Sequence, residues 1–451
     1  MGRRRNKLSD QPFEVDITGL DSRGLGLAVH AEKTLKVTDA LAGEKVIARY
    51  LFGRKQRGRV EVLEIKQASP DRVQPRCPHF GNCGGCSLQH MSMEAQLASK
   101  QASLLKSLRD AGGSEPATLY APLRGPEWNY RRKARLSVRD VAGKGRVLVG
   151  FRERDGRYVA DMQSCHVLSS KIANALPQMS LLLEKLSCRG QVPQLEVACD
   201  DQQCALIIRH LVDITRADTE HLQVFSQVAG IGIYLQSAGP DSIHLLAPPE
   251  LQLEYSLESL GLRFEFGPQD FIQVNGELNQ QMVMRALVLL QPQAEDNILD
   301  LFCGLGNFTL ALATRAGRVM GVEGSAEMVE RARSNASLNA LSNVEFAAIN
   351  LYANSFELGS AAPWPGTNYN KIMLDPPRSG AQELLPWIAA SSVSHVLYIS
   401  CNPGTLATDA ALLVKEYGFS LAGAGIINMF PHTAHNEAIA LFVREQMVAS
   451  S

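Results

Sequence analysis

The chain has 451 residues, of which 45% are hydrophobic and 20% are charged, a composition that excludes disordered and collagen-like proteins. This length predicts about two to three domains. No stretch approaches the roughly 20 apolar residues of a membrane span, and the basic N-terminus lacks the apolar segment of a secretory signal. We therefore expect a cytoplasmic protein that contacts no membrane. Its nine cysteines predict metal ligands, catalytic thiols or core residues rather than disulfides.

The net charge of −1 hides an uneven distribution along the chain. Residues 1–157 hold 30 Lys and Arg against 17 Asp and Glu, a net +13, whereas residues 158–451 hold 15 against 29, a net −14. A basic front third favours binding of a polyanion by that part of the chain. The sign of the charge does not distinguish RNA from DNA.

Residues 1–68 are predicted to form a small OB-like β-barrel. Short alternating runs at 13–17, 25–29, 45–50 and 58–63 are separated by turn residues, as in barrels that bind nucleic acid. The segment 54–59 has four cations in six residues, which predicts phosphate contacts, with a solvated hairpin tip as the alternative.

Three cysteines follow in a Pro- and Gly-rich loop at Cys77, Cys83 and Cys86, and the nearest later cysteine is Cys165. Three clustered thiolates need a fourth ligand, which makes this quartet a candidate metal site. The spacing alone leaves zinc and an iron–sulfur cluster equally open.

The region 69–265 is predicted to be a mostly β central domain. It begins with a helix at 93–111, which is a candidate to pack on the C-terminal domain and ends at paired glycines. Residues 124–157 then hold 11 Lys and Arg against 4 acids, interleaved with aromatic residues and strand-like runs. Such a sheet is typical of single-stranded RNA binding. Residues 167–265 carry no chemical motif.

Residues 266–451 are predicted to form a Rossmann-like domain, because helices and apolar strands alternate from a helix at 277–291 onward. The whole chain is thus a multidomain α/β protein. A strand at 298–302 runs into Cys303-Gly304-Leu305-Gly306-Asn307, and the next two strands end in Glu323 and Asn350. Polar residues at successive strand ends meet at one edge of a parallel sheet. The missing third glycine favours an S-adenosylmethionine methyltransferase over a nicotinamide enzyme.

Two later strand ends carry Asp375-Pro376-Pro377-Arg378 and Ser400-Cys401-Asn402-Pro403. A cysteine at an open sheet edge is a candidate nucleophile, and Glu437 in the polar turn that follows Phe430-Pro431-His432 is a candidate base. This pair suits C5 of uracil, which attacks a methyl sulfonium only after a thiolate has added to C6. His432 and His435 are weak evidence for a metal site.

These motifs, with Phe271-Ile272-Gln273-Val274-Asn275, resemble those of the RNA uracil-C5 methyltransferase family, densely from about 268 to 451. The resemblance implies Cys401 as the nucleophile and Glu437 as the base that removes the C5 proton. It also implies cofactor contacts from Gln273, Phe302, Asn307, Glu323, Asn350 and Asp375, the last also a candidate to contact the uracil.

The cysteine pattern is similar to that of the bacterial 23S rRNA branch of this family, which has a [4Fe-4S] cluster and an N-terminal TRAM barrel, both absent from the tRNA branch. The resemblance implies Cys77, Cys83, Cys86 and Cys165 as cluster ligands. It further implies methylation of C5 of one uridine of 23S rRNA, position 1939 in the usual numbering. We also expect a monomer. Cys188, Cys199, Cys204 and Cys303 are predicted core residues without partners.

Other functions remain as alternatives. They are methylation of another rRNA or tRNA uridine, and a non-catalytic RNA-binding assembly factor, although the latter leaves Cys401, Asp375 and Glu437 unexplained. A radical S-adenosylmethionine enzyme needs a Cys-x3-Cys-x2-Cys loop, whereas the first spacing here is x5.

Overall fold

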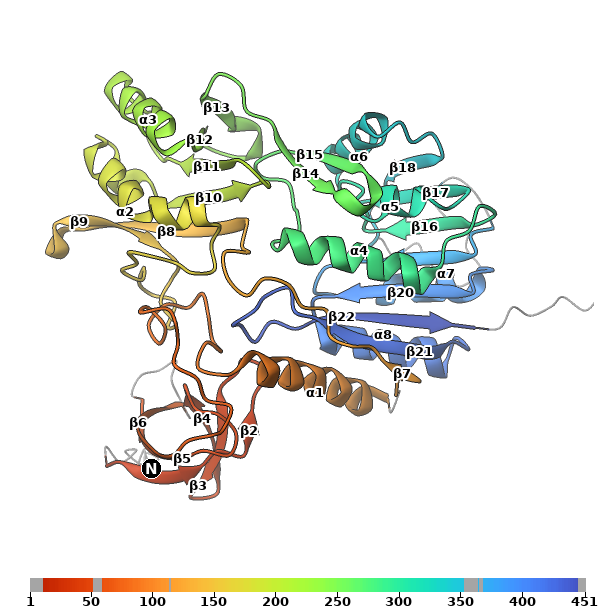
Figure 1. Ribbon diagram of the computed structural model, residues 1–451, viewed down its shortest axis with the longest axis horizontal. Helices are drawn as coiled ribbons and strands as arrows, with labels where there is room; N and C mark the ends of the chain where they lie inside the picture. The colour runs from red at the N-terminus through yellow and green to blue at the C-terminus, as the bar shows by residue number, and fades with distance from the viewer. Residues whose placement is uncertain (1–10, 52–58, 113–114, 353–363, 365–367, 445–451) are drawn as a thin grey trace, which may run out of the picture. The chain divides into compact units, whose positions relative to one another are not determined.

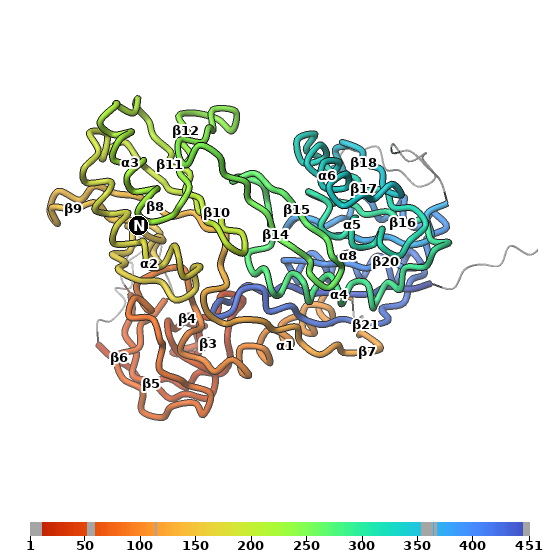
Figure 2. The backbone as a smooth tube through the Cα atoms, turned by 45° about the horizontal axis from the view of Figure 1, so that its top comes forward, coloured from red at the N-terminus to blue at the C-terminus, as the bar shows by residue number. Residues whose placement is uncertain are grey.

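The computed structural model describes residues 11–51, 59–112, 115–352, 364 and 368–444 (Figures 1 and 2). The chain forms two compact units. Unit 1 contains the residues up to Ser99, Phe151–Ala160 and Phe430–His435, and unit 2 contains Lys100–Gly150, Asp161–Met429 and the residues from Asn436 onward. These units cut across the predicted boundaries near residues 68 and 265, so the division into three domains stays a prediction.

Unit 1 is built on a six-stranded sheet in the order β1-β5-β6-β4-β3-β2. Its strands are β1 (Phe13–Asp16), β2 (Gly19–Leu20), β3 (Gly26–His30), β4 (Lys33–Thr38), β5 (Lys45–Tyr50) and β6 (Arg59–Gln67). The four predicted strands are confirmed, while β2 and β4 were missed. In β4, Leu35 and Val37 are buried on either side of the exposed Lys36, and both join the core around Val46 and Val60. Most of the predicted basic segment, Arg54–Gly58, lies outside the described residues.

Polar side chains join this sheet to the segments packed on it within unit 1. The buried carboxylate of Glu44 accepts the Arg72 guanidinium and the backbone N–H groups of Leu41 and Ser69. The carbonyl of His432 accepts the N–H groups of Ser87 and Leu88, both at 2.9 Å. The loop 430–435 is therefore bonded to the segment directly after Cys86.

Unit 2 contains a second six-stranded sheet, ordered β13-β12-β11-β10-β8-β9. Its strands are β8 (Lys133–Val141), β9 (Arg146–Gly150), β10 (Gln194–Cys199), β11 (Cys204–Arg209), β12 (Gly232–Gln236) and β13 (His244–Ala247), covered by α2 (Ser170–Lys185) and α3 (Arg216–Ala229). The predicted strands at 134–138 and 146–151 are confirmed. Several cations of this basic stretch are engaged internally, since Lys144 and Arg146 pair with Asp161, and Arg132 is buried.

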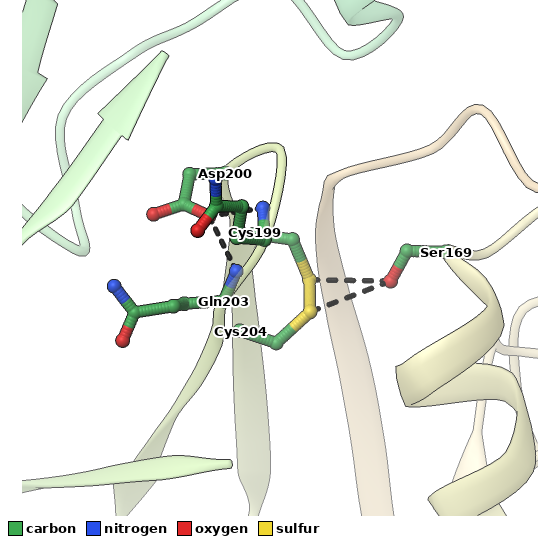
Figure 3. The surroundings of a disulfide bond; sticks show 6 residues. Ser169, Cys199, Asp200, Gln203 and Cys204 are labelled. Atoms are coloured by element: carbon green, nitrogen blue, oxygen red, sulfur yellow. Dashed lines mark hydrogen bonds between the residues drawn. A yellow bond between two sulfur atoms is a disulfide. The ribbon is translucent and has the colours of Figure 1, made fainter. Parts of the chain in front are cut away.

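Cys199 and Cys204 form a disulfide between β10 and β11, where they are directly opposed in the register (Figure 3). The expectation that these two cysteines have no partner was therefore wrong, because the four-residue connection between them is a tight hairpin. Ser169 Oγ lies 3.2 Å from the Cys199 sulfur. Cys188 and Cys303 are buried, as predicted for core residues.

The largest sheet of unit 2 has eight strands in the order β18-β17-β16-β19-β20-β22-β21-β7 (Figure 1). They are β7 (Thr118–Leu119), β16 (Asn297–Leu301), β17 (Arg318–Glu323), β18 (Val344–Ala348), β19 (Lys371–Leu374), β20 (His395–Ser400), β21 (Ser420–Ile427) and β22 (Glu437–Val443). Strands β16 to β20 are parallel, as predicted. The central residues of β16, β17, β19 and β20 are almost wholly apolar and buried, as strands covered on both faces require. However, β22 runs antiparallel to β20 and β21. The sheet is therefore mixed rather than wholly parallel.

Helices and one hairpin complete the unit around this sheet. They are α4 (Gly276–Leu290), α5 (Thr309–Ala313), α6 (Ala326–Leu338), α7 (Leu385–Ala390), α8 (Pro403–Lys415) and the hairpin of β14 (Leu253–Leu257) with β15 (Leu262–Phe266). Helix α1 (Met93–Gly112) confirms the helix predicted at 93–111. Its Gly112 lies against Ala411 of α8. Among the described residues, no helix is both long and apolar enough to cross a membrane.

Candidate active site

A cavity of about 530 Å³ opens at the carboxyl edge of the parallel strands of unit 2, a size typical of small-molecule sites. Its lining includes every residue predicted to contact the cofactor and both predicted catalytic residues: Gln273, Phe302, Asn307, Glu323, Asn350, Asp375, Cys401 and Glu437. The sheet topology thus brings together residues that are up to 164 positions apart in the sequence.

The turn after β16 is shaped by left-handed backbone. Phe302 has φ +66°, Gly304 +56° and Gly306 +94°. A Cβ at Gly306 would lie 2.6 Å from Leu310, so this position requires glycine for both conformation and space. The turn is tied down by the N–H groups of Phe302 and Cys303, which donate to the Val322 carbonyl.

Glu323 is held by backbone at the end of β17. Its Oε2 accepts the N–H of Gly304 at 3.2 Å, and its Oε1 accepts the N–H of Ser325 at 3.0 Å. A carboxylate has about four acceptor positions, so two remain for hydroxyl donors in the cavity. This geometry fits the predicted ribose contact.

Asn307 belongs to a polar layer that the sequence did not reveal. Its amide exchanges two hydrogen bonds with Asn279 of α4, at 2.9 and 3.0 Å, and its Oδ1 also accepts the Tyr255 hydroxyl at 2.9 Å. The guanidinium of Arg132 lies over the Tyr255 ring at 4.7 Å, and its Nε donates to the Gln273 carbonyl at 2.8 Å. The layer orients both Asn307 and Gln273.

Asn350 lies at the exposed rim of the cavity. Its Oδ1 accepts the N–H of Tyr352 at 3.0 Å, and the Tyr352 ring lies 5.6 Å from that of Phe302. The Tyr352 hydroxyl accepts a hydrogen bond from Ser379 in the loop that follows Arg378. Aromatic surface and a polar edge therefore share this side of the cavity.

The two candidate catalytic residues are neighbours because β22 is antiparallel. Ser400, the last residue of β20, is in register with Ala438 of β22. Cys401 follows Ser400 and Glu437 precedes Ala438, so both side chains reach the carboxyl edge beside Asp375. A wholly parallel sheet would have placed the start of this strand at the opposite edge.

Burial controls the protonation of these acids. It raises the pKa of Asp375 to about 7. It also raises the pKa of Glu437 to about 8, helped by the charge of Asp375 and opposed by the ammonium of Lys100. The pKa of the Cys401 thiol is raised by burial and by the charges of Glu437 and Asp375, against which the Arg378 guanidinium favours the thiolate. Perturbed titrating groups gathered in one cavity are typical of an active site.

Comparisons with known proteins agree with this geometry. A family model described as tRNA (Uracil-5-)-methyltransferase matches residues 93–445. The chain is 46% identical over 447 residues to a 23S rRNA (uracil(1939)-C(5))-methyltransferase RlmD of Alkalilimnicola ehrlichii, with 99% of each chain covered. A protein of the same name from Methylococcus capsulatus is 45% identical, with 98% of this chain and 100% of the relative covered. The chain belongs to the RNA uracil-C5 methyltransferase family.

Membership confirms the family resemblance predicted from the sequence, and with it the class of S-adenosylmethionine-dependent RNA uracil-C5 methyltransferases. The fold also matches a solved structure of this family. The Pyrococcus abyssi tRNA (uracil-54, C5)-methyltransferase in complex with S-adenosyl-L-homocysteine superposes with a TM-score of 0.72 at 21% identity, covering 95% of this chain and 99% of that one. At this identity the likeness establishes the shared fold.

The structure gives less support to the predicted metal site at the four cysteines than to the cofactor site at the cavity. Cys77, Cys83 and Cys86 share one loop of unit 1, in which the Cys83 sulfur accepts the N–H of Gly85 at 3.4 Å, whereas Cys165 is buried in unit 2. In the described part of the chain, no group of three or more His, Cys, Asp or Glu side chains is arranged to hold a metal ion. The quartet therefore stays a prediction.

Proposed function

We propose that this enzyme transfers a methyl group from S-adenosyl-L-methionine to C5 of a uridine in 23S rRNA, at the position numbered 1939 in the names of its relatives. Identity of 44–46% along nearly the whole chain supports the same substrate. The observation that carries the chemistry is the pairing of Cys401 and Glu437, in neighbouring register across β20 and β22, inside the cofactor-sized cavity.

The mechanism we propose divides the work between these two residues. The Cys401 thiolate adds to C6 of the uracil, and the electron pair of the C5–C6 bond moves so that C5 becomes nucleophilic. Bound S-adenosylmethionine supplies the methyl group that C5 takes. Glu437, as carboxylate, then removes the C5 proton, the C5–C6 double bond re-forms, and the Cys401 thiolate leaves.

Asp375 and the strand-end residues serve as binding groups in this proposal. With a pKa near 7, Asp375 is protonated often enough to donate as well as to accept hydrogen bonds, which suits an amide-like uracil edge. Glu323 would accept the ribose hydroxyls of the cofactor, and Asn350 its adenine edge. Gln273, Phe302 and Asn307 would complete the cofactor site.

We further propose that Cys77, Cys83, Cys86 and Cys165 hold a [4Fe-4S] cluster and that the six-stranded sheet of unit 1 is a TRAM barrel. Support for the cluster comes from the family resemblance, while the cysteine spacing and the N–H···S bond to Cys83 suit a thiolate metal ligand of either kind. Because the described cysteines form no metal-binding group, no step of the reaction is assigned to the cluster. We also propose that the enzyme is a monomer and acts in the cytoplasm.

The decisive experiment follows a labelled methyl group into 23S rRNA that lacks the modification. Wild-type enzyme is expected to label it, and Cys401→Ala to give neither labelled RNA nor a covalent complex. Glu437→Gln keeps the shape of the side chain but not the base, so a methylated protein–RNA complex that survives denaturing electrophoresis should accumulate. Glu416→Gln, at the end of α8, is the matched control. Labelling of tRNA in place of rRNA would refute the substrate, and normal turnover by Cys401→Ala would refute the mechanism.

A further inference from the structure

One cation of unit 2 is buried beside the candidate base and has no role in the mechanism above. Lys100, on α1, is 4% exposed, and its Nζ donates to Asn428 Oδ1 at 2.7 Å. An ammonium group is costly to bury and is rarely found in a protein interior unless something there requires its charge. Its position therefore calls for an explanation.

Two hydrogen bonds hold Lys100 at the residues that frame Glu437. Asn428 follows Ile427 of β21, which is in register with Glu437. Asn436, directly before Glu437, donates its Nδ2 to the Lys100 carbonyl at 2.7 Å. The side chain of Lys100 is thus bonded next to β21, and its backbone is bonded next to β22, the strand that begins with Glu437.

Glu437 needs such a neighbour. It is 5% exposed, and within the described residues its Oε2 has no hydrogen-bond partner, although it lines the active-site cavity. In the described part of the chain, the titratable groups that act on Glu437 are Asp375, Cys401 and Lys100, and only Lys100 can carry a positive charge. Burial lowers the pKa of Lys100 to about 7, and the carboxylate of Glu437 opposes this shift, so the ammonium is present mainly at neutral pH and below. Burial and the charge of Asp375 favour the protonated carboxyl, which cannot accept the C5 proton, and the charge of Lys100 opposes them.

We propose that Lys100 is a positioning residue for Glu437: the positive charge that it holds beside the base increases the ionised fraction of Glu437 available to remove the C5 proton. This inference rests on the proposed role of Glu437. Lys100 acts on the base rather than on the nucleophile, since Arg378 is the cation whose charge favours the Cys401 thiolate. Loss of Lys100 should therefore spare addition and methyl transfer and slow the elimination that follows them.

The test compares Lys100→Met and Lys100→Gln with wild type in single-turnover reactions with labelled cofactor, scored for the methylated covalent complex from pH 6.5 to 9. Gln keeps an N–H donor but has no charge, so comparing the two variants separates loss of charge from loss of the donor to Asn428. An opposite charge nearby shifts a carboxyl pKa by about 1 to 3 units. We expect release of the complex to slow about tenfold near pH 7, where wild-type Lys100 still carries charge. The difference from wild type should shrink as the pH rises, because Lys100 then loses its charge and Glu437 ionises without it.

Three controls make the result specific. Lys106→Met, on the exposed face of the same helix, should behave as wild type. In a Glu437→Gln background, Lys100→Gln should add nothing, because it acts through that residue. Trapping by 5-fluorouridine RNA, which needs no base, should remain normal. The inference would be overturned if both variants released the methylated complex at the wild-type rate at every pH, or if folded variants were no longer trapped. Failure of the wild-type enzyme to form any complex would instead overturn the proposed mechanism.

Discussion

Glu323→Gln offers a quantitative test of the cofactor site. Each carboxylate oxygen of Glu323 already accepts one backbone N–H, from Gly304 or Ser325. A glutamine has one carbonyl oxygen and one NH2 group, so its nitrogen must face one of these donors. The variant also loses the charge that strengthens the bonds to the two ribose hydroxyls.

The cost follows from those bonds. A hydrogen bond to a charged group contributes about 1.5–3 kcal/mol, so weakening two of them should cost roughly 2–3 kcal/mol. This corresponds to a Kd for S-adenosylhomocysteine that rises roughly 30- to 150-fold, which titration calorimetry can measure. The matched control is Glu345→Gln on the adjacent β18, an exposed residue paired with Arg318, which should leave the Kd unchanged. A folded Glu323→Gln protein that binds within threefold of wild type would refute the assignment.

Two further predictions concern the RNA surface and the cysteines. Arg139→Ser removes an exposed cation of the basic stretch, so RNA affinity should fall and the slope of log affinity against log salt should decrease by about one. The control Arg318→Ser, in the acidic part of the chain, should change neither quantity. Equal effects of the two substitutions would contradict an RNA surface at 124–157. Protein purified without oxygen should be brown with about four irons per chain. Cys83→Ser should lose iron but keep its affinity for S-adenosylmethionine, and the control Cys188→Ala should lose neither. Colourless protein with stoichiometric zinc would contradict the cluster.

Much of the carboxyl-edge site could be predicted from the sequence because Phe302, Asp375 and Cys401 each follow an apolar strand directly. Asp375 and Cys401 end neighbouring parallel strands, so their meeting needs no more than the rule that such ends share one edge. Glu437 begins a strand, and its place depends on the reversed direction of β22, which an apolar run does not reveal. Glu437 could be predicted only from the motif that precedes it, because the hydrophobic pattern of the strand does not show the strand's direction.

Other parts of the site had no local signal. Tyr255 and Arg132 contact the residues of the cavity from segments more than 100 positions apart, and their role depends on tertiary packing alone. Nothing in the sequence distinguishes Lys100 from the other cations of the helix at 93–111, because its burial depends on how that helix packs against Asn428. The disulfide between Cys199 and Cys204 could not be predicted from cysteine number alone, because it depends on a hairpin that places the two residues opposite each other in the register.

The central claim is that Cys401 bonds covalently to the uracil, and peptide mapping of a trapped complex tests it most directly. Wild-type enzyme would be incubated with S-adenosylmethionine and 23S rRNA fragments carrying 5-fluorouridine at the target position, then digested and analysed by mass spectrometry. The account predicts a single modified peptide in which Cys401 carries a methylated fluorouridine, because fluorine cannot be removed as a proton is. Attachment at any other cysteine, or no attachment by enzyme that methylates ordinary rRNA at its normal rate, would contradict it.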